Sequence, residues 1–287
     1  MNNSIKERIE NLLEDIILSD QSVSGGCIAD SRIVKMKSGR NYFLKQGFSN
    51  DMFHKEANSL RELGKPGVIK VPDVVMVDND FLLLECISSG KKPNSFYEEF
   101  GRQFARLHKV SNASYGFYED NYIGASPQYN IAKGDEKTNW TSFYLNKRLM
   151  PQVQMAKSNG YYDREFANLF EKLSLRISDI LQGSDEPASL LHGDLWSGNY
   201  MVGSSGEPVV IDPAVYYGHR EADLAMTKLF GGYPASFYNA YNEEYPLQSG
   251  SEYRLSLYML YHVLNHLNLF RTGYYGQVIS ILKKYVS

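Results

Sequence analysis

Cysteine is scarce in this sequence of 287 residues, which contains only Cys27 and Cys86. Two thiols without paired metal-ligand spacing cannot form a disulfide framework, predict no zinc site and fit a reducing compartment. Long apolar runs are also absent, because no stretch of roughly eighteen apolar residues occurs. The N-terminal segment has the pattern of an amphipathic helix and not of an export signal. We therefore expect a cytoplasmic protein that does not enter a membrane.

Charge of one sign is not in excess either. The net charge is −3 and the isoelectric point is about 6.1, which argues against nucleic acid or an acidic membrane as the partner of the whole surface. Aromatic residues, in contrast, are plentiful, with 22 tyrosines in the chain. We interpret most of them as packing residues, with a ring-lined pocket for a polyol or an amine as the alternative.

The first part of the chain is rich in predicted strands. Short β-rich runs fill residues 22–46 and include a hairpin across the turn SGRN. Helical spacing over residues 50–63 predicts one helix, with Asn50 or Asp51 as its N-cap. A second hairpin crosses the turn DND. These elements predict an N-terminal lobe over residues 1–87.

The remaining residues, 88–287, are mostly helical in pattern. A polar, glycine-containing segment over residues 115–137 interrupts the helices, and a loop of that length is typical of a functional element. Short apolar strands are predicted over residues 189–192, 200–202 and 208–211. The sequence as a whole therefore predicts an α+β fold with two lobes, the second larger and mostly helical.

The stretch LLHGDLWSGN contains Asp194 and, five residues later, Asn199. An aspartate at a strand end can accept a proton from an attacking hydroxyl, and an amide oxygen on the returning loop can ligate a divalent metal. Asp212 in VVIDPA supplies a second carboxylate for the same metal. His192 is expected to support the loop by hydrogen bonding. These residues predict a catalytic base, Asp194, beside two metal ligands, Asn199 and Asp212.

This spacing matches the kinase signature H-x-D-L-x-x-x-N followed by a metal-binding aspartate. Lys45 ends the predicted strand NYFLKQ, and Glu56 lies on the following helix, as expected of a phosphate-binding lysine and its partner. The arginine of the protein-kinase signature is absent, so a phosphorylated activation loop has no partner and we expect constitutive activity. The pattern predicts a protein-kinase-like fold that uses ATP and Mg²⁺.

Two further segments are predicted to contact the nucleotide. The run SGGCIADS places Gly25 and Gly26 between strands, where their backbone N–H groups can cover phosphates. The strand FLLLECI leads to a hinge, where the backbone from Glu85 to Ile87 is predicted to bind an adenine edge. Cys27 in the glycine-containing run is interpreted either as a low-pKa thiolate that forms an intermolecular disulfide or as an inert packing residue.

Several segments together resemble the fructosamine kinase (ketosamine-3-kinase) family. They span roughly residues 22–232 and include SGGCIADS, FHKEANSL, WTSFYLNKRLMPQ, LLHGDLWSGN and IDPAVYYGHREADLAMTKLFGG. The pair HGDLWSGN and GHREADLAM is more specific than the kinase spacing, which choline kinases and aminoglycoside phosphotransferases share. The resemblance implies phosphorylation of the 3-hydroxyl of the sugar in ketoamines, small or protein-bound, with subsequent release of the amine. Separately, we expect a monomer or weak dimer.

The resemblance also implies roles for individual residues. Asp194 is then the base toward the 3-hydroxyl, Asn199 and Asp212 are the magnesium ligands, and Lys45, positioned by Glu56, contacts the phosphates. Trp196 is a candidate for stacking on the sugar, with packing under the loop as the alternative. Asn121, Gln128 and Asn130 are candidates for the substrate side, with capping of turns as the alternative. His219 is a further candidate for that side.

Residues 220–223 follow the same motif. We interpret Asp223 as a helix-terminal carboxylate that supports the catalytic loop. The roles of Arg220 and Glu221 are left open between substrate binding and structure. His108, His262 and His266 have helical spacing that is typical of positions in or beside the core, and not of catalytic residues.

Two other functions are compatible with parts of this pattern. A kinase of the same fold acting on an aminoglycoside needs an acidic pocket, and one acting on choline needs an aromatic cage. A non-catalytic nucleotide-binding module is the alternative from another class. The presence of all five residues Lys45, Glu56, Asp194, Asn199 and Asp212 argues against the module, because nucleotide binding alone needs few of them.

Overall fold

The computed structural model describes residues 1–23, 29–47 and 51–286, which form two compact units. The first unit comprises Met1–Phe96 and Tyr200–Pro213, and the second comprises Tyr97–Asn199 and Ala214–Ser287. The predicted division at residue 87 differs from this arrangement, because the first unit continues to Phe96 and also takes in a segment from the second half of the sequence.

That later segment is a hairpin of β10 (Tyr200–Val202) and β11 (Pro208–Val210). The Gly90 amide donates a hydrogen bond to the Val202 carbonyl at 3.1 Å, and the Val210 amide donates to the Lys70 carbonyl at 3.0 Å. These backbone bonds tie the hairpin to residues more than a hundred positions earlier. No local sequence pattern reports such a pairing, which explains the difference from the predicted boundary.

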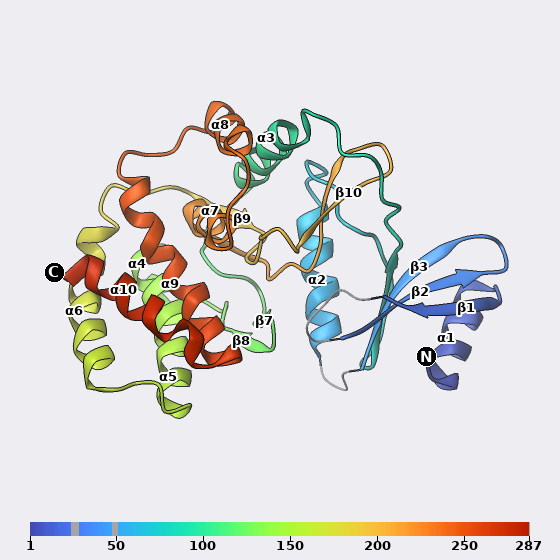
Figure 1. Ribbon diagram of the computed structural model, residues 1–287, viewed down its shortest axis with the longest axis horizontal. Coiled ribbons are helices and arrows are strands. Elements are labelled where there is room, and N and C mark those ends of the chain that lie inside the picture. The colour runs from blue at the N-terminus through green and yellow to red at the C-terminus, as the bar shows by residue number, and fades with distance from the viewer. Residues whose placement is uncertain (24–28, 48–50, 287) are drawn as a thin grey trace. The chain divides into compact units, whose positions relative to one another are not determined.

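The first unit contains a five-stranded antiparallel sheet in the order β1-β2-β3-β5-β4, shown in blue to teal in Figure 1. The strands are β1 (Ile17–Ser22), β2 (Asp30–Met36), β3 (Asn41–Gln46), β4 (Val74–Val77) and β5 (Phe81–Glu85). The two helices that cover the sheet are α1 (Asn3–Leu13) and α2 (Met52–Gly64). Both predicted hairpins are confirmed, since β2 pairs with β3 and β4 pairs with β5.

The alternation of side chains in β5 explains why two helices cover this sheet. Phe81 and Leu83 pack in one apolar cluster with Ile5 and Ile9 of α1, whereas Leu82 and Leu84 pack in another with α2. Successive strand residues point to opposite faces, so both faces of a central strand need an apolar cover. The α2 helix is thereby fixed against the strand that neighbours β3.

The second unit is mostly helical. Its helices are α3 (Phe96–His108), α4 (Trp140–Tyr144), α5 (Met150–Ser158), α6 (Arg164–Ile180), α7 (Arg220–Leu229), α8 (Ala235–Glu244), α9 (Ser251–Phe270) and α10 (Tyr275–Val286). Shorter helical turns are η1 (Gly134–Lys137), η2 (Leu145–Leu149) and η3 (Thr272–Tyr274). Helix α7 packs on the largely buried α9, and α10 packs on both α6 and α9. Among the described residues, no helix is both long enough and apolar enough to cross a bilayer.

Two small sheets complete the second unit. The strands β12 (Tyr216–Gly218), β9 (Ala188–Leu191) and β6 (Ser111–Asn112) form one sheet in that order. The strands β7 (Asn121–Ile123) and β8 (Ser126–Gln128) form a hairpin inside the predicted long loop. The predicted catalytic motif begins directly after β9, so the central strand of the first of these sheets positions it.

Candidate active site

The first unit contains a cluster of one lysine and two carboxylates. The Lys45 Nζ lies 2.6 Å from the Glu56 Oε1 and 2.5 Å from the Asp212 Oδ1. Lys45 ends β3, Glu56 lies on α2, and Asp212 follows β11, so three separate elements meet at this ammonium. Burial disfavours the charged form of Lys45, but the charges of Asp212 and Glu56 outweigh it and raise the pKa of the ammonium above its usual value. The lysine is therefore held as a cation.

Asp212 has a backbone conformation that the sequence did not indicate. Its φ of 55° lies in the left-handed region, where non-glycine residues are uncommon and aspartate is among the better tolerated. Such a conformation is destabilising by roughly 1–3 kcal/mol and is typical of functional sites. The strain accompanies a carboxylate that contacts Lys45 while remaining 37% exposed. Asp212 therefore contacts Lys45 while part of its carboxylate stays accessible.

The structure narrows the predicted hinge contact without testing it. The Glu85 amide donates to the Asp73 carbonyl at 2.8 Å, and its carboxylate contacts Lys70 at 2.9 Å. The amide is therefore already used within the first unit. The Glu85 carbonyl and the backbone as far as Ile87, which follows the end of β5, stay the predicted contacts to an adenine edge. Gly25, Gly26 and Cys27 lie outside the described residues.

The loop between β9 and β10 in the second unit contains the predicted catalytic residues and is called the catalytic loop below. The Asn199 Nδ2 donates to the Asp194 carbonyl at 2.8 Å and lies 3.4 Å from the Asp194 Oδ2, so the two side chains predicted to act together are neighbours. The Asp194 amide donates to the His192 Nδ1 at 3.2 Å, which confirms the supporting role predicted for His192. Gly193 has a φ of 84°, and a Cβ there would lie 2.0 Å from the Ala214 carbonyl oxygen. Only glycine fits at that position.

Asp223 supports this loop by hydrogen bonding to its backbone, as the sequence predicted. The Asp223 carboxylate accepts the amide protons of His192 at 2.7 Å and Gly193 at 2.8 Å, and the His108 Nε2 lies 3.2 Å from it. Burial by itself raises the pKa of the Asp223 carboxyl, but the hydrogen bond from His108 and the Gly193 amide lower it below its usual value. The His108 Nδ1 lies 2.7 Å from the Tyr241 hydroxyl, which orients the ring. Asp223 is a positioning residue for the catalytic loop.

The neighbouring motif residues are structural. Arg220 makes a double contact with Glu186 at 2.7 and 2.6 Å, and Glu221 makes one with Arg254 at 2.8 and 2.6 Å. All these groups are buried or nearly so. The roles of Arg220 and Glu221, left open by the sequence, are therefore structural, because both side chains form buried ion pairs. Removing one partner of such a pair strongly destabilises the fold.

His219 was a candidate for substrate binding, and the structure reassigns it. Its side chain is fully buried, its Nδ1 accepts the Glu221 amide proton at 3.3 Å, and its ring stacks on Tyr258 with centroids 5.6 Å apart. Burial lowers the pKa of His219 below its usual value. An imidazole in this position caps α7 and has no surface to offer to a substrate.

Asn121, Gln128 and Asn130 are likewise buried rather than lining a surface. The Asn121 Nδ2 donates to the Val215 carbonyl at 2.8 Å, and the Gln128 Nε2 donates to the Ala214 carbonyl at 2.9 Å. The predicted substrate contacts are therefore corrected to support of the segment that follows Asp212 and Pro213 in the chain.

Arg148 joins the same network, although no sequence pattern indicated its role. Its guanidinium is fully buried, donates to the Asn130 Oδ1 at 2.7 Å and lies 3.8 Å from the centroid of the Tyr216 ring. Buried cations require partners, and here carbonyl oxygens and ring faces provide them. The loop that contains β7 and β8 is thus fastened to the residues beside the catalytic loop.

Trp196 lies partly exposed within the catalytic loop. Gly198 allows the indole to fold over the loop, because a Cβ there would lie 2.4 Å from the Trp196 Cζ2. The indole also contacts Phe230, whose ring meets it edge-on with centroids 5.9 Å apart. Packing accounts for part of the Trp196 surface, and its role in stacking on the sugar stays a prediction.

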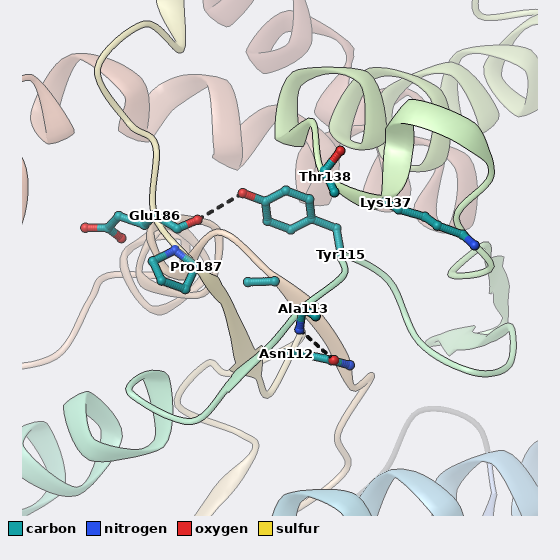
Figure 2. A pocket seen from close by; sticks show the side chains of 8 residues that line it. Asn112, Ala113, Tyr115, Lys137, Thr138, Glu186 and Pro187 are labelled. Carbon is teal, nitrogen blue, oxygen red and sulfur yellow. Dashed lines mark hydrogen bonds between the residues drawn. The ribbon is translucent and has the colours of Figure 1, made fainter.

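A small cavity of about 160 Å³ lies elsewhere in the second unit and is shown in Figure 2. The Tyr115 hydroxyl donates across it to the Glu186 carbonyl at 3.0 Å. Its described lining residues, among which no predicted site residue occurs, are Asn112, Ala113, Tyr115, Lys137, Thr138, Glu186, Pro187 and Ala188. The cavity is therefore not part of the candidate active site.

His262 predicts a dependence of stability on pH. Burial lowers its pKa to about 3, and its Nδ1 has no hydrogen-bond partner within the described structure. Below pH ~6.5 the unfolded chain binds a proton that the folded chain excludes, so this group destabilises the fold as the pH falls from ~6.5 toward 3. At pH ~5.5 the loss is about 1.4 kcal/mol. Urea denaturation at pH ~7.5 and ~5.5 should show a loss of stability on acidification that is about 1.4 kcal/mol smaller in His262→Gln than in the parent. Equal pH dependence in both proteins would refute the assignment.

Comparison with known proteins identifies the family. The fructosamine kinase family model matches residues 1–287. A probable ketoamine kinase of Synechocystis sp. is 36% identical over 92% of this chain and 89% of its own length. A chloroplastic protein-ribulosamine 3-kinase of Oryza sativa subsp. indica is also 36% identical, over 92% of this chain and 78% of its own. The crystal structure of a putative fructosamine-3-kinase from Thermobifida fusca superposes with a TM-score of 0.89 at 30% identity, covering 99% of each chain. The predicted α+β, kinase-like fold is confirmed, and this chain belongs to the fructosamine kinase family.

Proposed function

We propose that this protein transfers the terminal phosphoryl group of ATP to the 3-hydroxyl of the sugar in ketoamines. The observation that carries the phosphoryl-transfer part is the Lys45 ammonium held between Glu56 and Asp212. The ketoamine part is supported by membership of the family and by the names of the relatives, a probable ketoamine kinase and a protein-ribulosamine 3-kinase. A product phosphorylated next to the ketone carbonyl is then the species from which the amine is released.

Each unit supplies part of the chemistry. In the first unit, Lys45 contacts the phosphates, and the contact with Glu56 prevents the lysine from turning away. In the second unit, the Asp194 carboxylate orients the 3-hydroxyl and accepts its proton as the oxygen attacks the phosphorus. Asp223 keeps the Asp194 backbone in place through the two preceding amides. Placement and charge neutralisation, rather than covalent chemistry, account for the rate.

The donor atoms fit magnesium. Among the described residues no group of three or more histidine, cysteine or carboxylate side chains is arranged as a metal cage. Magnesium does not need one, because it keeps several waters and is held by one or two protein oxygens together with substrate phosphates. The Asp212 carboxylate and the Asn199 amide oxygen would hold it, and the Asn199 contact to Asp194 through Nδ2 leaves the amide oxygen for that purpose. Bound Mg²⁺ supplies charge neutralisation at the phosphates.

A substrate panel tests the proposal. Purified protein with MgATP is offered fructosyl- and ribulosyl-adducts of a small amine, a glycated protein, choline and an aminoglycoside, and ADP release is measured. We expect turnover with the ketoamines and phosphorus NMR that places the new ester on O3. Turnover restricted to choline or the aminoglycoside would transfer the function to another kinase class of this fold. ATP binding without turnover of any acceptor would favour the non-catalytic module.

A further inference from the structure

A row of rings extends from the catalytic loop along the second unit, and we call it the aromatic strip. Its members are Trp196, Phe230, His266, Phe270 and Tyr274. Ring centroids are 5.9 Å apart from Trp196 to Phe230 and 4.9 Å apart from Phe230 to His266. From His266 the distances are 5.4 Å to Phe270 and 5.2 Å to Tyr274. The strip begins two residues after the predicted catalytic base.

The strip is not a piece of the core. Phe230 is 38% exposed and Phe270 is 52% exposed, while the other three rings are partly exposed. Rings packed only for stability in this unit, such as Phe143 and Phe237, are fully buried. A contiguous exposed apolar surface in a protein marks a binding site more often than a scattered exposed ring does.

The backbone around the strip has unusual conformations. Arg271, which follows Phe270 at the end of α9, has a φ of 71° although it is not glycine. This turn sends the chain into η3 and places Phe270 and Tyr274 in contact with the same histidine. Strain of roughly 1–3 kcal/mol at a non-glycine residue indicates that the surrounding structure requires the conformation.

The strip is also uncharged at neutral pH. Burial lowers the pKa of His266 below its usual value, and its Nδ1 donates to the His262 carbonyl at 2.8 Å. A neutral imidazole with its proton on Nδ1 does not repel a nearby ammonium. Aromatic faces attract ammonium groups and pack well against hydrocarbon chains. The surface therefore suits an organic amine and does not suit a phosphate or a carboxylate.

We propose that the aromatic strip binds the amine portion of the ketoamine and makes the enzyme favour amines with an apolar substituent. This inference rests on the proposed function. With the sugar 3-hydroxyl at Asp194, the nitrogen and its substituent have to leave the catalytic loop, and the rings from Trp196 through Phe230 to Phe270 form a continuous surface on which they can lie. The occupant is the hydrocarbon or aromatic part of the amine, such as a benzyl group or the four-carbon stem of a glycated lysine.

Two ketoamines that differ only in the amine provide the test. The fructose adducts of benzylamine and methylamine share the reacting sugar, so the ratio of their kcat/KM values reports on the amine portion alone. We expect the wild type to prefer the benzylamine adduct by about tenfold, which is the range of one or two ring contacts. In Phe270→Ser we expect that ratio to fall about fivefold, and in Tyr274→Ser about threefold. Leu175→Ser, a change at a residue on α6 that is 80% exposed, is the matched control and should keep the wild-type ratio.

The outcomes separate the strip from the proposed function. If the wild type phosphorylates both adducts equally well, or if the Phe270→Ser ratio stays at the wild-type value, the strip does not bind the amine although the kinase activity stands. If the wild type phosphorylates neither adduct, the proposed function fails and the strip proposal fails with it. Light scattering on the same proteins checks self-association. A mass that falls in Phe270→Ser with an unchanged ratio would assign the surface to contact between copies and overturn the proposal.

Discussion

Asp194→Asn is expected to lower kcat by about a thousandfold or more, equivalent to about 4 kcal/mol of barrier. The amide has the same shape but cannot accept the proton of the attacking hydroxyl. Steady-state kinetics with a ketoamine that the wild type phosphorylates measures the effect. The KM for ATP should change little, because the lysine proposed to contact the phosphates lies with Glu56 and Asp212 in the first unit.

The same substitution should leave the fold intact, which separates chemistry from stability. The closest contact of Asn199 in this loop is to the Asp194 carbonyl at 2.8 Å and survives the change, whereas its contact with the carboxylate is longer, at 3.4 Å. We expect the thermal midpoint to stay within about two degrees of the wild type, since surface changes are usually within about 0.5 kcal/mol. Asp179→Asn, on the exposed face of α6, is the matched control with wild-type kcat. A kcat near the wild-type value in Asp194→Asn would remove Asp194 from the role of base.

Contacts between the predicted site residues follow from their order and spacing in the sequence. Lys45 at the end of a strand and Glu56 on the next helix are brought together by a short connection, and the contact was predictable from that order alone. The same holds for Asp194 and Asn199, which share one loop. The position of Asp212 is harder to predict from the sequence, because its hairpin joins the first unit through backbone hydrogen bonds with Gly90 and Lys70.

The errors concern residues whose partners lie far away in the sequence. Asn121 and Gln128 have the composition of a substrate loop, yet their amides are used by backbone carbonyls some ninety positions later. Residue type indicates which groups can form hydrogen bonds, whereas only the tertiary structure determines which partners they find.

Arg148 shows the same limit from the opposite side. It lies between lysine and leucine in NKRLM, a context that is typical of a solvent-exposed arginine. Its burial depends on Tyr216 and Tyr261, whose rings lie 3.8 and 5.6 Å from the guanidinium carbon and come from distant segments. A local pattern contains no information about such a pocket, so the sequence did not indicate Arg148. The amides of the same network were identified as candidates, but for substrate contacts and not for structural support.

Asp223→Asn should affect both stability and rate, because a buried carboxylate here receives the amides of two successive loop residues. Asparagine keeps one acceptor oxygen and turns an N–H group toward the second amide, which leaves a buried donor without an acceptor. We expect the free energy of unfolding to fall by about 3 kcal/mol. The loop that bears Asp194 then loses its fixed position, and kcat should fall by about ten- to a hundredfold with little change in the KM for ATP.

Glu221→Gln is the control that separates support of the loop from stability in general. Glu221 lies on the same turn of α7 and is as deeply buried, but it pairs with Arg254 instead of the catalytic loop. Breaking that pair should lower the free energy of unfolding by a similar amount, about 3 kcal/mol, while kcat measured well below the unfolding midpoint stays within about twofold of the wild type. Urea denaturation and steady-state kinetics on both variants make the comparison. If the two variants lose the same fraction of kcat, Asp223 stabilises the unit without positioning the base, and the geometry around Gly193 would then have to be maintained by the bond from the Ala214 amide to the His192 carbonyl at 2.8 Å.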